Sequence, residues 1–306
     1  MKLAALSVDL DEIGCYAAIH GLDVPSECAN AIHDRAVPRL AQFFARQGVP
    51  ATFFAIGADL GRPENAAAVR GLHAAGHEVA NHSYSHFYDL TRRSRDEVRM
   101  DVLRGGEAIE RVTGAPPVGF RAPGYTLTDD VLSVLDELGY LYDSSVFPCP
   151  AYFSAKTLAI AAIRARGRRS RSLVDDPRVL LAPADPYRSG TPYWTRGRGI
   201  LELPIGVTRD GAGRMPYIGT SVVLSGAAGA RVLTELAVGR PLVNLELHGI
   251  DLADADEDGL GWLKPHQPDL RRTARAKEAA LESAIATLRR HGYTFVTLAD
   301  AARRLG

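Results

Sequence analysis

Residues 3–11 read LAALSVDLD, an apolar run that ends in two acidic residues separated by one leucine. The apolar part, Leu3 to Val8, has the length and composition of a β-strand. Side chains alternate between the two faces of a strand, so Asp9 and Asp11 should point the same way while Leu10 points to the other face. The stretch therefore predicts a strand that delivers two carboxylates to one small volume.

Outward from this strand, β-type runs alternate with helical patterns, which is typical of a parallel sheet wrapped by helices. The further strands are expected at 51–56, around Val79, and at 119–122, 140–143, 201–204, 242–247 and 293–297. The helices are expected at 36–47, 63–76, 94–113, 128–138, 227–238 and 270–290, with one more at the C-terminal end. Ser94 and Glu97 have the spacing of a capping box. About seven βα units predict an α/β fold and favour a barrel over an open sheet.

Residues 150–200 break this rhythm. An apolar helical run, Thr157 to Ile163, precedes five arginines within eight residues and then a turn-rich stretch. The arginines are Arg164, Arg166, Arg168, Arg169 and Arg171. We expect residues 1–306 to form a single domain with this insertion over one face.

The composition excludes several classes of partner and site. Lysine plus arginine equals aspartate plus glutamate at 36 each, so no global field attracts nucleic acid, and we expect no such partner. Cys15, Cys28 and Cys149 contain no C-x-x-C pair, which argues against a disulfide framework or a thiolate zinc site. The first apolar run is too short for a signal peptide, and no transmembrane segment is expected. These features predict a cytoplasmic protein; they do not indicate an oligomeric state.

Polar residues follow several of the expected strands, and in a parallel sheet such residues gather at one edge. His82 and His86 lie four apart, a spacing that on a helical turn places both imidazoles on one face. With Asp11 they would supply three ligands to one divalent ion and leave room for water and substrate. Zinc is the first choice for such ligands, and iron, cobalt and nickel are alternatives. The competing interpretation is a solvated turn and a capping aspartate.

Two further strand ends carry residues suited to acid–base chemistry. The forked guanidinium of Arg121 can hold a carboxylate such as Asp9 ionised and oriented, and Tyr125 can close a pocket or bind substrate. His248 follows a strand and precedes a glycine, so it can protonate a leaving group near neutral pH. Its expected partner is Asp143, with Asp251 as the competitor.

Together these segments resemble a known family. DLD at 9–11, HSYSH at 82–86, RAPGY at 121–125 and LHG at 247–249 occur in the order seen in polysaccharide deacetylases of the NodB-homology type, carbohydrate esterase family 4. The resemblance covers Leu3 to about Pro148 and resumes at Leu201. The leucine between the two aspartates resembles a D-x-D branch of this family, which leaves the substrate more open than the chemistry.

The resemblance implies a distorted (β/α) barrel and a catalytic domain that removes an N-acyl group, acetyl or formyl, from an amino sugar or glycan by a metal-activated water. It implies Asp11, His82 and His86 as metal ligands. It also implies Asp9 as general base, Arg121 as the residue that steadies Asp9, and His248 as general acid. Tyr125 and Asp143 are carried over as substrate-binding residues, although the segment around Asp143 departs from the family pattern.

Several alternatives remain open from the sequence. The apolar run and arginines of the insertion can seat a lipid-phosphate-linked sugar at a membrane surface, or form an ordinary amphipathic helix with a solvated end. A ureide amidohydrolase of allantoinase type and a non-catalytic carbohydrate-binding barrel also fit the same fold. A non-heme iron oxygenase is disfavoured by the strand–helix alternation.

Overall fold

The computed structural model describes residues 1–165 and 173–306, and its single sheet has nine strands. The strands are β1 Leu3–Asp9, β2 Thr52–Ala55, β3 Glu78–Asn81, β4 Gly119–Phe120, β5 Tyr142–Asp143, β6 Tyr187–Ser189, β7 Arg196–Glu202, β8 Leu242–His248 and β9 Thr294–Phe295. Their order is β6-β7-β5-β4-β3-β2-β1-β8, and β9 also pairs with β1. Of these strands only β6 is antiparallel to its neighbour. The predicted α/β fold with a curled parallel sheet is therefore confirmed, with eight parallel strands instead of about seven.

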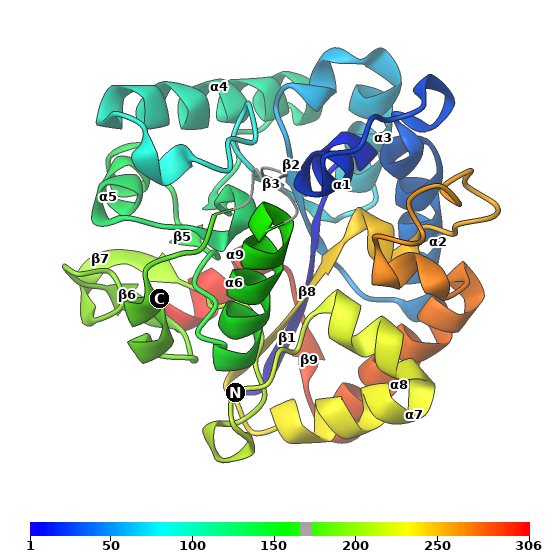
Figure 1. Ribbon diagram of the computed structural model, residues 1–306. Coiled ribbons are helices and arrows are strands. Elements are labelled where there is room, and N and C mark those ends of the chain that lie inside the picture. The colour runs from blue at the N-terminus through cyan, green and yellow to red at the C-terminus, as the bar shows by residue number, and fades with distance from the viewer. Residues whose placement is uncertain (166–172) are drawn as a thin grey trace.

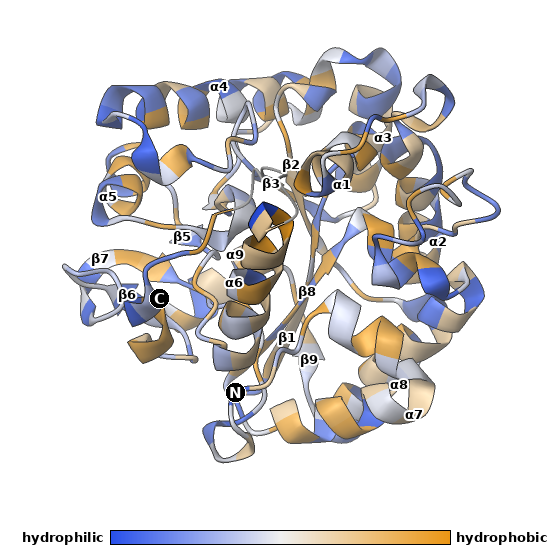
Figure 2. Cartoon of the chain, viewed as in Figure 1, coloured by the Kyte–Doolittle hydropathy of each residue, from blue (hydrophilic) through white to orange (hydrophobic). Residues whose placement is uncertain are grey.

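Helices surround this sheet. They are α1 Ile13–His20, α2 Val37–Gln47, α3 Pro63–Ala74, α4 Arg95–Thr113, α5 Asp129–Glu137, α6 Pro150–Ala165, α7 Gly219–Ala237, α8 Ala274–Arg290 and α9 Leu298–Leu305. Figure 1 shows α2 to α5, α7 and α8 arranged around the strands, while α6 lies in front of the sheet. In Figure 2 the outer helices alternate between hydrophilic and hydrophobic colours, as expected for amphipathic helices packed on a core.

Local signals in the sequence account for the ends of several helices. The capping box at the start of α4 is confirmed, because the Ser94 side chain accepts from the Glu97 amide and the Glu97 carboxylate accepts from the Ser94 amide. α2 ends at Gly48, whose φ of 60° is the left-handed conformation that glycine adopts without a Cβ penalty. These caps fix the lengths of the helices and so the positions at which the strands begin.

The barrel is distorted between β7 and β8. No ladder joins these two strands within residues 1–165 and 173–306, and β7 instead pairs with β5 and β6. The Asn244 side-chain amide bridges part of this opening, because its Nδ2 lies 3.2 Å from the Pro204 carbonyl oxygen and 3.1 Å from Ser144 Oγ. One polar side chain therefore takes over hydrogen bonds that a closed barrel would make between backbones.

The region expected as an insertion contains α6, β6 and the start of β7. The helix begins at Pro150, earlier than the expected apolar run, and β7 reaches back to Arg196, so part of the region belongs to the sheet rather than covering it. Arg164 is exposed on the last turn of α6. The other four arginines, Arg166, Arg168, Arg169 and Arg171, lie outside the described residues. None of the described helices is long and apolar enough to cross a membrane.

Candidate active site

The register between β1 and β8 builds the centre of the site. Ser7 lies opposite Glu246 and Asp9 opposite His248, whereas at the other end of the ladder Leu3 lies opposite Leu242. The leucine pair belongs to an apolar cluster that fills the interior of the sheet. Because side chains alternate along a strand, the same inward face turns from apolar to polar toward the carboxyl ends of the strands. The polar residues are thus buried by the barrel that positions them.

Asp11, His82 and His86 converge at this carboxyl edge. The Asp11 Oδ1 atom lies 3.3 Å from Nε2 of His82 and 3.3 Å from Nε2 of His86. One ligand atom from each residue lies within 4.8 Å of the other two, a grouping that can hold a metal ion. All three residues are buried, yet Asp11 Oδ1 and His86 Nε2 have no hydrogen-bond partner. Buried polar atoms without partners are rare, so this donor set fits a divalent cation.

The two histidines do not share a helical turn, and that part of the sequence interpretation is wrong. Residues 82–86 form a loop after β3 in which Ser83 and His86 have positive φ values of 65° and 50°. The Ser83 hydroxyl accepts the His86 amide at 3.0 Å, and the Asp101 carboxylate of α4 accepts the Tyr84 and Ser85 amides. Hydrogen bonds from α4 thus hold a backbone that is strained at two residues, as is common at functional sites.

The other ring nitrogen of each histidine also has a contact. His82 Nδ1 lies 2.7 Å from the Arg121 carbonyl oxygen, a contact in which the nitrogen must donate. That hydrogen bond fixes the tautomer and leaves Nε2 with a lone pair toward Asp11. His86 Nδ1 lies 3.6 Å from Cys15 Sγ on α1. Both rings are therefore oriented with Nε2 toward the carboxylate.

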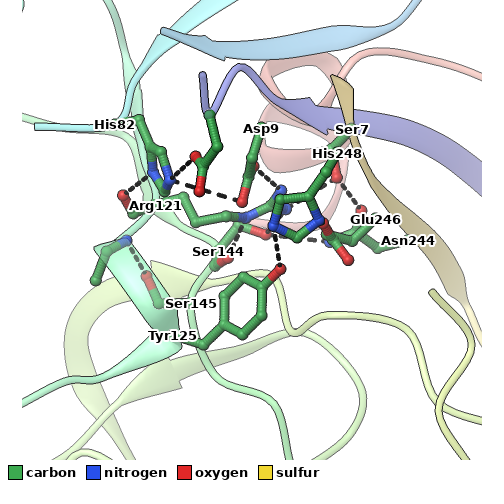
Figure 3. Close-up of polar contacts among 12 residues, drawn as sticks. Ser7, Asp9, His82, Arg121, Tyr125, Ser144, Ser145, Asn244, Glu246 and His248 are labelled. Carbon is green, nitrogen blue, oxygen red and sulfur yellow. Dashed lines mark hydrogen bonds and ion pairs between the residues drawn. The ribbon is translucent and has the colours of Figure 1, made fainter. Parts of the chain in front are cut away.

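Arg121 organises the residues around Asp9 (Figure 3). Its Nη1 donates to Asp9 Oδ1 at 2.7 Å, and the guanidinium is fully buried over the ring of Phe54. The remaining donors reach Ser7 Oγ and both the hydroxyl and carbonyl oxygens of Ser144. A buried cation with all of these bonds cannot reorient, so Asp9 Oδ1 is held in place. The other carboxylate oxygen of Asp9, Oδ2, lies 3.7 Å from His82 Nε2.

His248 pairs with Glu246, two residues earlier on the same face of β8. Nδ1 of His248 lies 2.9 Å from Glu246 Oε1, and Nε2 lies 3.3 Å from the Tyr125 hydroxyl. Burial disfavours the charged imidazolium, but Glu246, with smaller contributions from Asp9 and Asp11, outweighs it and raises the pKa of His248 well above its usual value. This shift favours the protonated form of His248.

The sequence-based partners of His248 need correction. Asp143 is fully buried and its two oxygens accept from the Ser145 hydroxyl and amide, so it contacts neither His248 nor the cavity described below. Burial raises the pKa of Asp143, and burial together with the charge of Asp143 raises the pKa of Glu202 well above its usual value. Asp251 accepts from the backbone amide of His248 at 2.8 Å, not from the ring. Neither aspartate is placed to bind the imidazole.

A cavity of about 280 Å³ opens over these groups. Its lining includes Asp9, Asp11, His82, Tyr125 and His248 from the strand ends. The opposite walls come from α1, α6 and the segment before α8. Tyr125 has a φ of 59° next to Gly124 at 65°, which turns its ring toward His248. The predicted base, acid and one predicted substrate-binding residue thus share a cavity with two of the three expected metal ligands.

Sequence reasoning missed Ser7, Ser144, Asn244 and Glu246. A usable signal was present in residues 242–248, LVNLELH, where polar residues recur at every second position. This period of two marks one face of a strand, and here that face points into the barrel. The expected strand was interpreted as apolar, so its row of polar residues was overlooked.

With this geometry established, comparison with known proteins shows which family the chain resembles. The family model described as polysaccharide deacetylase matches residues 28–142, which include His82, His86, Arg121 and Tyr125. Asp9, Asp11 and His248 lie outside that range but complete the same site in space. Over residues 28–142 the chain is similar to the polysaccharide deacetylase family.

Curated relatives match over part of their length. A peptidoglycan deacetylase of Helicobacter pylori is 29% identical over 147 residues, which are 47% of this chain and 49% of the relative. A chitooligosaccharide deacetylase of Sinorhizobium fredii is 38% identical over 104 residues, 33% of this chain and 46% of the relative. The chain therefore spans about half the length of the curated relatives it matches.

Solved structures agree on the fold over nearly the whole chain. A Mycobacterium smegmatis protein provisionally named a polysaccharide deacetylase has a TM-score of 0.58 at 20% identity, covering 99% of this chain and 90% of that one. A carbohydrate esterase family 4 pseudoenzyme of Bacillus anthracis has a TM-score of 0.52 at 14% identity, covering 99% and 66%. Because the family fold also occurs in a pseudoenzyme, activity has to be argued from the site residues.

Proposed function

We propose that this protein is a metal-dependent hydrolase that removes the N-acetyl group of an amino sugar. One observation carries the proposal: unpartnered ligand atoms of Asp11 and His86 lie beside two oriented pairs, Asp9–Arg121 and His248–Glu246. Amide hydrolysis needs a nucleophile, stabilisation of an oxyanion and a proton for the departing amine. This arrangement contains a candidate for each requirement.

Asp11, His82 and His86 would hold the ion. Two imidazoles and one carboxylate suit zinc first, and iron, cobalt or nickel as alternatives. A divalent ion bound there would lower the pKa of bound water to near neutrality and polarise the acyl oxygen. The contact from His82 Nδ1 to the Arg121 carbonyl would keep the His82 imidazole oriented toward the ion.

Asp9 would act as the general base. Its Oδ1 is held by Arg121, while Oδ2 faces the ligand group at 3.7 Å from His82 Nε2. An oxygen so directed can accept a proton from a water that attacks the acyl carbon. Arg121 positions this carboxylate and does not itself reach the cavity lining.

His248 would act as the general acid. Its Nδ1 forms the ion pair with Glu246, so Nε2 is the ring nitrogen on the cavity side, beside the Tyr125 hydroxyl. Amines are poor leaving groups as anions, and a proton delivered to the departing nitrogen removes that obstacle. The Glu246 carboxylate, which raises the pKa of His248, would favour the protonated imidazole before the reaction.

The names of the curated relatives, peptidoglycan deacetylase and chitooligosaccharide deacetylase, favour acetyl as the acyl group and an amino sugar as its carrier. Formyl, lipid-linked and ureide substrates remain alternatives for the same chemistry. All three cysteines are free, which supports a reducing, cytoplasmic location.

The proposal is tested by acetate release from N-acetylglucosamine and its short oligomers. The purified protein is stripped with a chelator and reloaded separately with zinc, cobalt, nickel or iron. We expect activity only after reloading, and a chelated protein that retains full turnover would contradict the proposal. Formate measured in parallel from the N-formyl analogues distinguishes the two acyl groups.

A further inference from the structure

Lys156 lies in the wall of the catalytic cavity opposite the strand ends. It comes from α6, the helix in front of the sheet in Figure 1, and lines the same cavity as Asp9 and His248. Its Nζ donates to the Gly124 carbonyl oxygen at 2.8 Å. That bond ties the ammonium to the loop that carries Tyr125, so the charge has a defined place beside the reacting groups.

The positive charge of Lys156 has no close counter-ion. An ammonium has three donors, and one is used by Gly124. Among the described residues no carboxylate lies within 4.0 Å of Nζ. Burial lowers the pKa of Lys156 to about 8, with Asp175 opposing from a greater distance. The Asp175 carboxyl itself accepts from the Tyr193 hydroxyl and the Asp176 amide.

Lys156 also stands out among the residues of the cavity. In the part of the chain that the structure describes, it is the only lysine or arginine in the cavity lining. A desolvated cation is costly unless an anion reaches it, and charge-assisted hydrogen bonds to carboxylate or phosphate are among the strongest available. An anion at this position would use the two remaining donors.

We propose that Lys156 binds an anionic substituent of the amino-sugar substrate, a carboxylate or a phosphate, and so selects charged over neutral sugars. This inference rests on the proposed function and adds the substrate class. The cavity volume of about 280 Å³ lies at the small end of ligand sites, which suits one sugar ring with its substituents. The acyl amide would face Asp9 and His248 while the anion faces α6.

The test compares three N-acetylated sugars on the zinc-loaded protein: neutral N-acetylglucosamine, N-acetylmuramic acid with a carboxylate, and N-acetylglucosamine 1-phosphate. We expect kcat/KM to be higher for at least one charged sugar, and the better of the two identifies the anion. Lys156→Met should reduce kcat/KM for that sugar about ten- to a hundredfold more than for the neutral one. Lys156→Arg should restore part of the difference.

Arg164→Met is the matched control, because Arg164 is a cation on the same helix but is exposed and outside the cavity lining. It should leave the preference unchanged. Equal losses on charged and neutral sugars in Lys156→Met would overturn the inference and indicate that the bond to Gly124 only supports the loop. Asp175→Asn should keep the preference for charged sugars. If this variant loses the preference, the inference is overturned in favour of a Lys156–Asp175 structural pair.

Titration calorimetry with the same sugars separates the two proposals. If no sugar releases acetate but a charged sugar binds the wild type more tightly than Lys156→Met, the proposed function fails and the anion site stands. If all three sugars are deacetylated equally well and bind both proteins equally, the anion site fails and the proposed function stands.

Discussion

Asp9 and His248 occupy the same rung of the β1–β8 ladder, so two adjacent parallel strands deliver the candidate base and the candidate acid to one cavity. Each has its own partner of opposite charge, Arg121 for Asp9 and Glu246 for His248. The two groups therefore have partners of opposite charge although they are neighbours. This division between a carboxylate and a protonated imidazole is what acid–base catalysis of amide cleavage requires.

Replacing either His82 or His86 with alanine should remove metal binding and turnover together. Each imidazole contributes one of three ligand atoms, and two remaining ligands hold an ion far less tightly. Metal content by elemental analysis, measured alongside acetate release, checks this. His73→Ala, an exposed histidine on α3, is the control and should retain both. A His86→Ala protein with full metal stoichiometry would exclude that residue from the ligand set.

Asp9→Asn should keep the metal and lose about a hundredfold or more in kcat, because a general base typically contributes 10²–10⁴-fold. Asparagine preserves the shape and can still accept from Arg121, whereas it cannot take up a proton from water. Metal content separates this outcome from a ligand role: if Asp9→Asn loses the ion, the assignments of Asp9 and Asp11 are exchanged. Circular dichroism controls for a fold disturbed around the buried guanidinium.

Glu246→Gln should shift the alkaline limb of the pH–rate profile to lower pH. Burial alone lowers the pKa of His248, and the Glu246 carboxylate is the largest contribution that raises it. Removing that charge lets the imidazolium lose its proton at lower pH, so the fraction of enzyme with a protonated acid falls earlier as pH rises. The profile of kcat/KM measures this shift. An unchanged limb with a uniformly lower rate would mean that Glu246 only supports the strand.

Features that depend on neighbours in the chain could be predicted from the sequence, whereas features that depend on distant residues could not. Turn chemistry and periodicity were sufficient to place Asp9 and Asp11 on one side of a strand and to locate the cap at Ser94, because both depend on neighbours in the chain. The loop with the positive φ values of Ser83 and His86 is held by backbone amides that donate to Asp101 on another element, which no local pattern reveals.

The partner of the His248 imidazole is likewise determined by the three-dimensional fold. Asp143 and Glu246 are both buried, but only Glu246 lies beside the His248 ring. Asp143 alternates along β5 with Tyr142 and Ser144, whose side chains point into the barrel, so it lies on the opposite face of the strand. The sequence indicated Asp143, at the end of another strand, as the partner, since the distance between strands is set by packing and cannot be obtained from spacing along the chain.

The stability of the fold should fall on acidification through His77. Its Nδ1 accepts the buried Ala51 amide at 3.1 Å, and the ring packs against Phe44 and Phe53, so only the neutral imidazole fits. Burial lowers the pKa of His77 below its usual value of 6.5. Below about pH 6.5 the unfolded chain therefore takes up a proton more readily than the folded one, and stability is lost as pH falls toward the folded-state pKa.

Urea unfolding at several pH values between 5 and 8 tests this, with two variants of His77. His77→Asn supplies a carbonyl oxygen in place of Nδ1 that does not titrate, so its unfolding midpoint should depend less on pH than that of the wild type. His77→Leu leaves the Ala51 amide without an acceptor and should cost about 1–3 kcal/mol at pH 7. His73→Gln, on an exposed face of α3, should retain the wild-type pH dependence. If His77→Asn loses stability on acidification as steeply as the wild type, another group is responsible for the acid sensitivity.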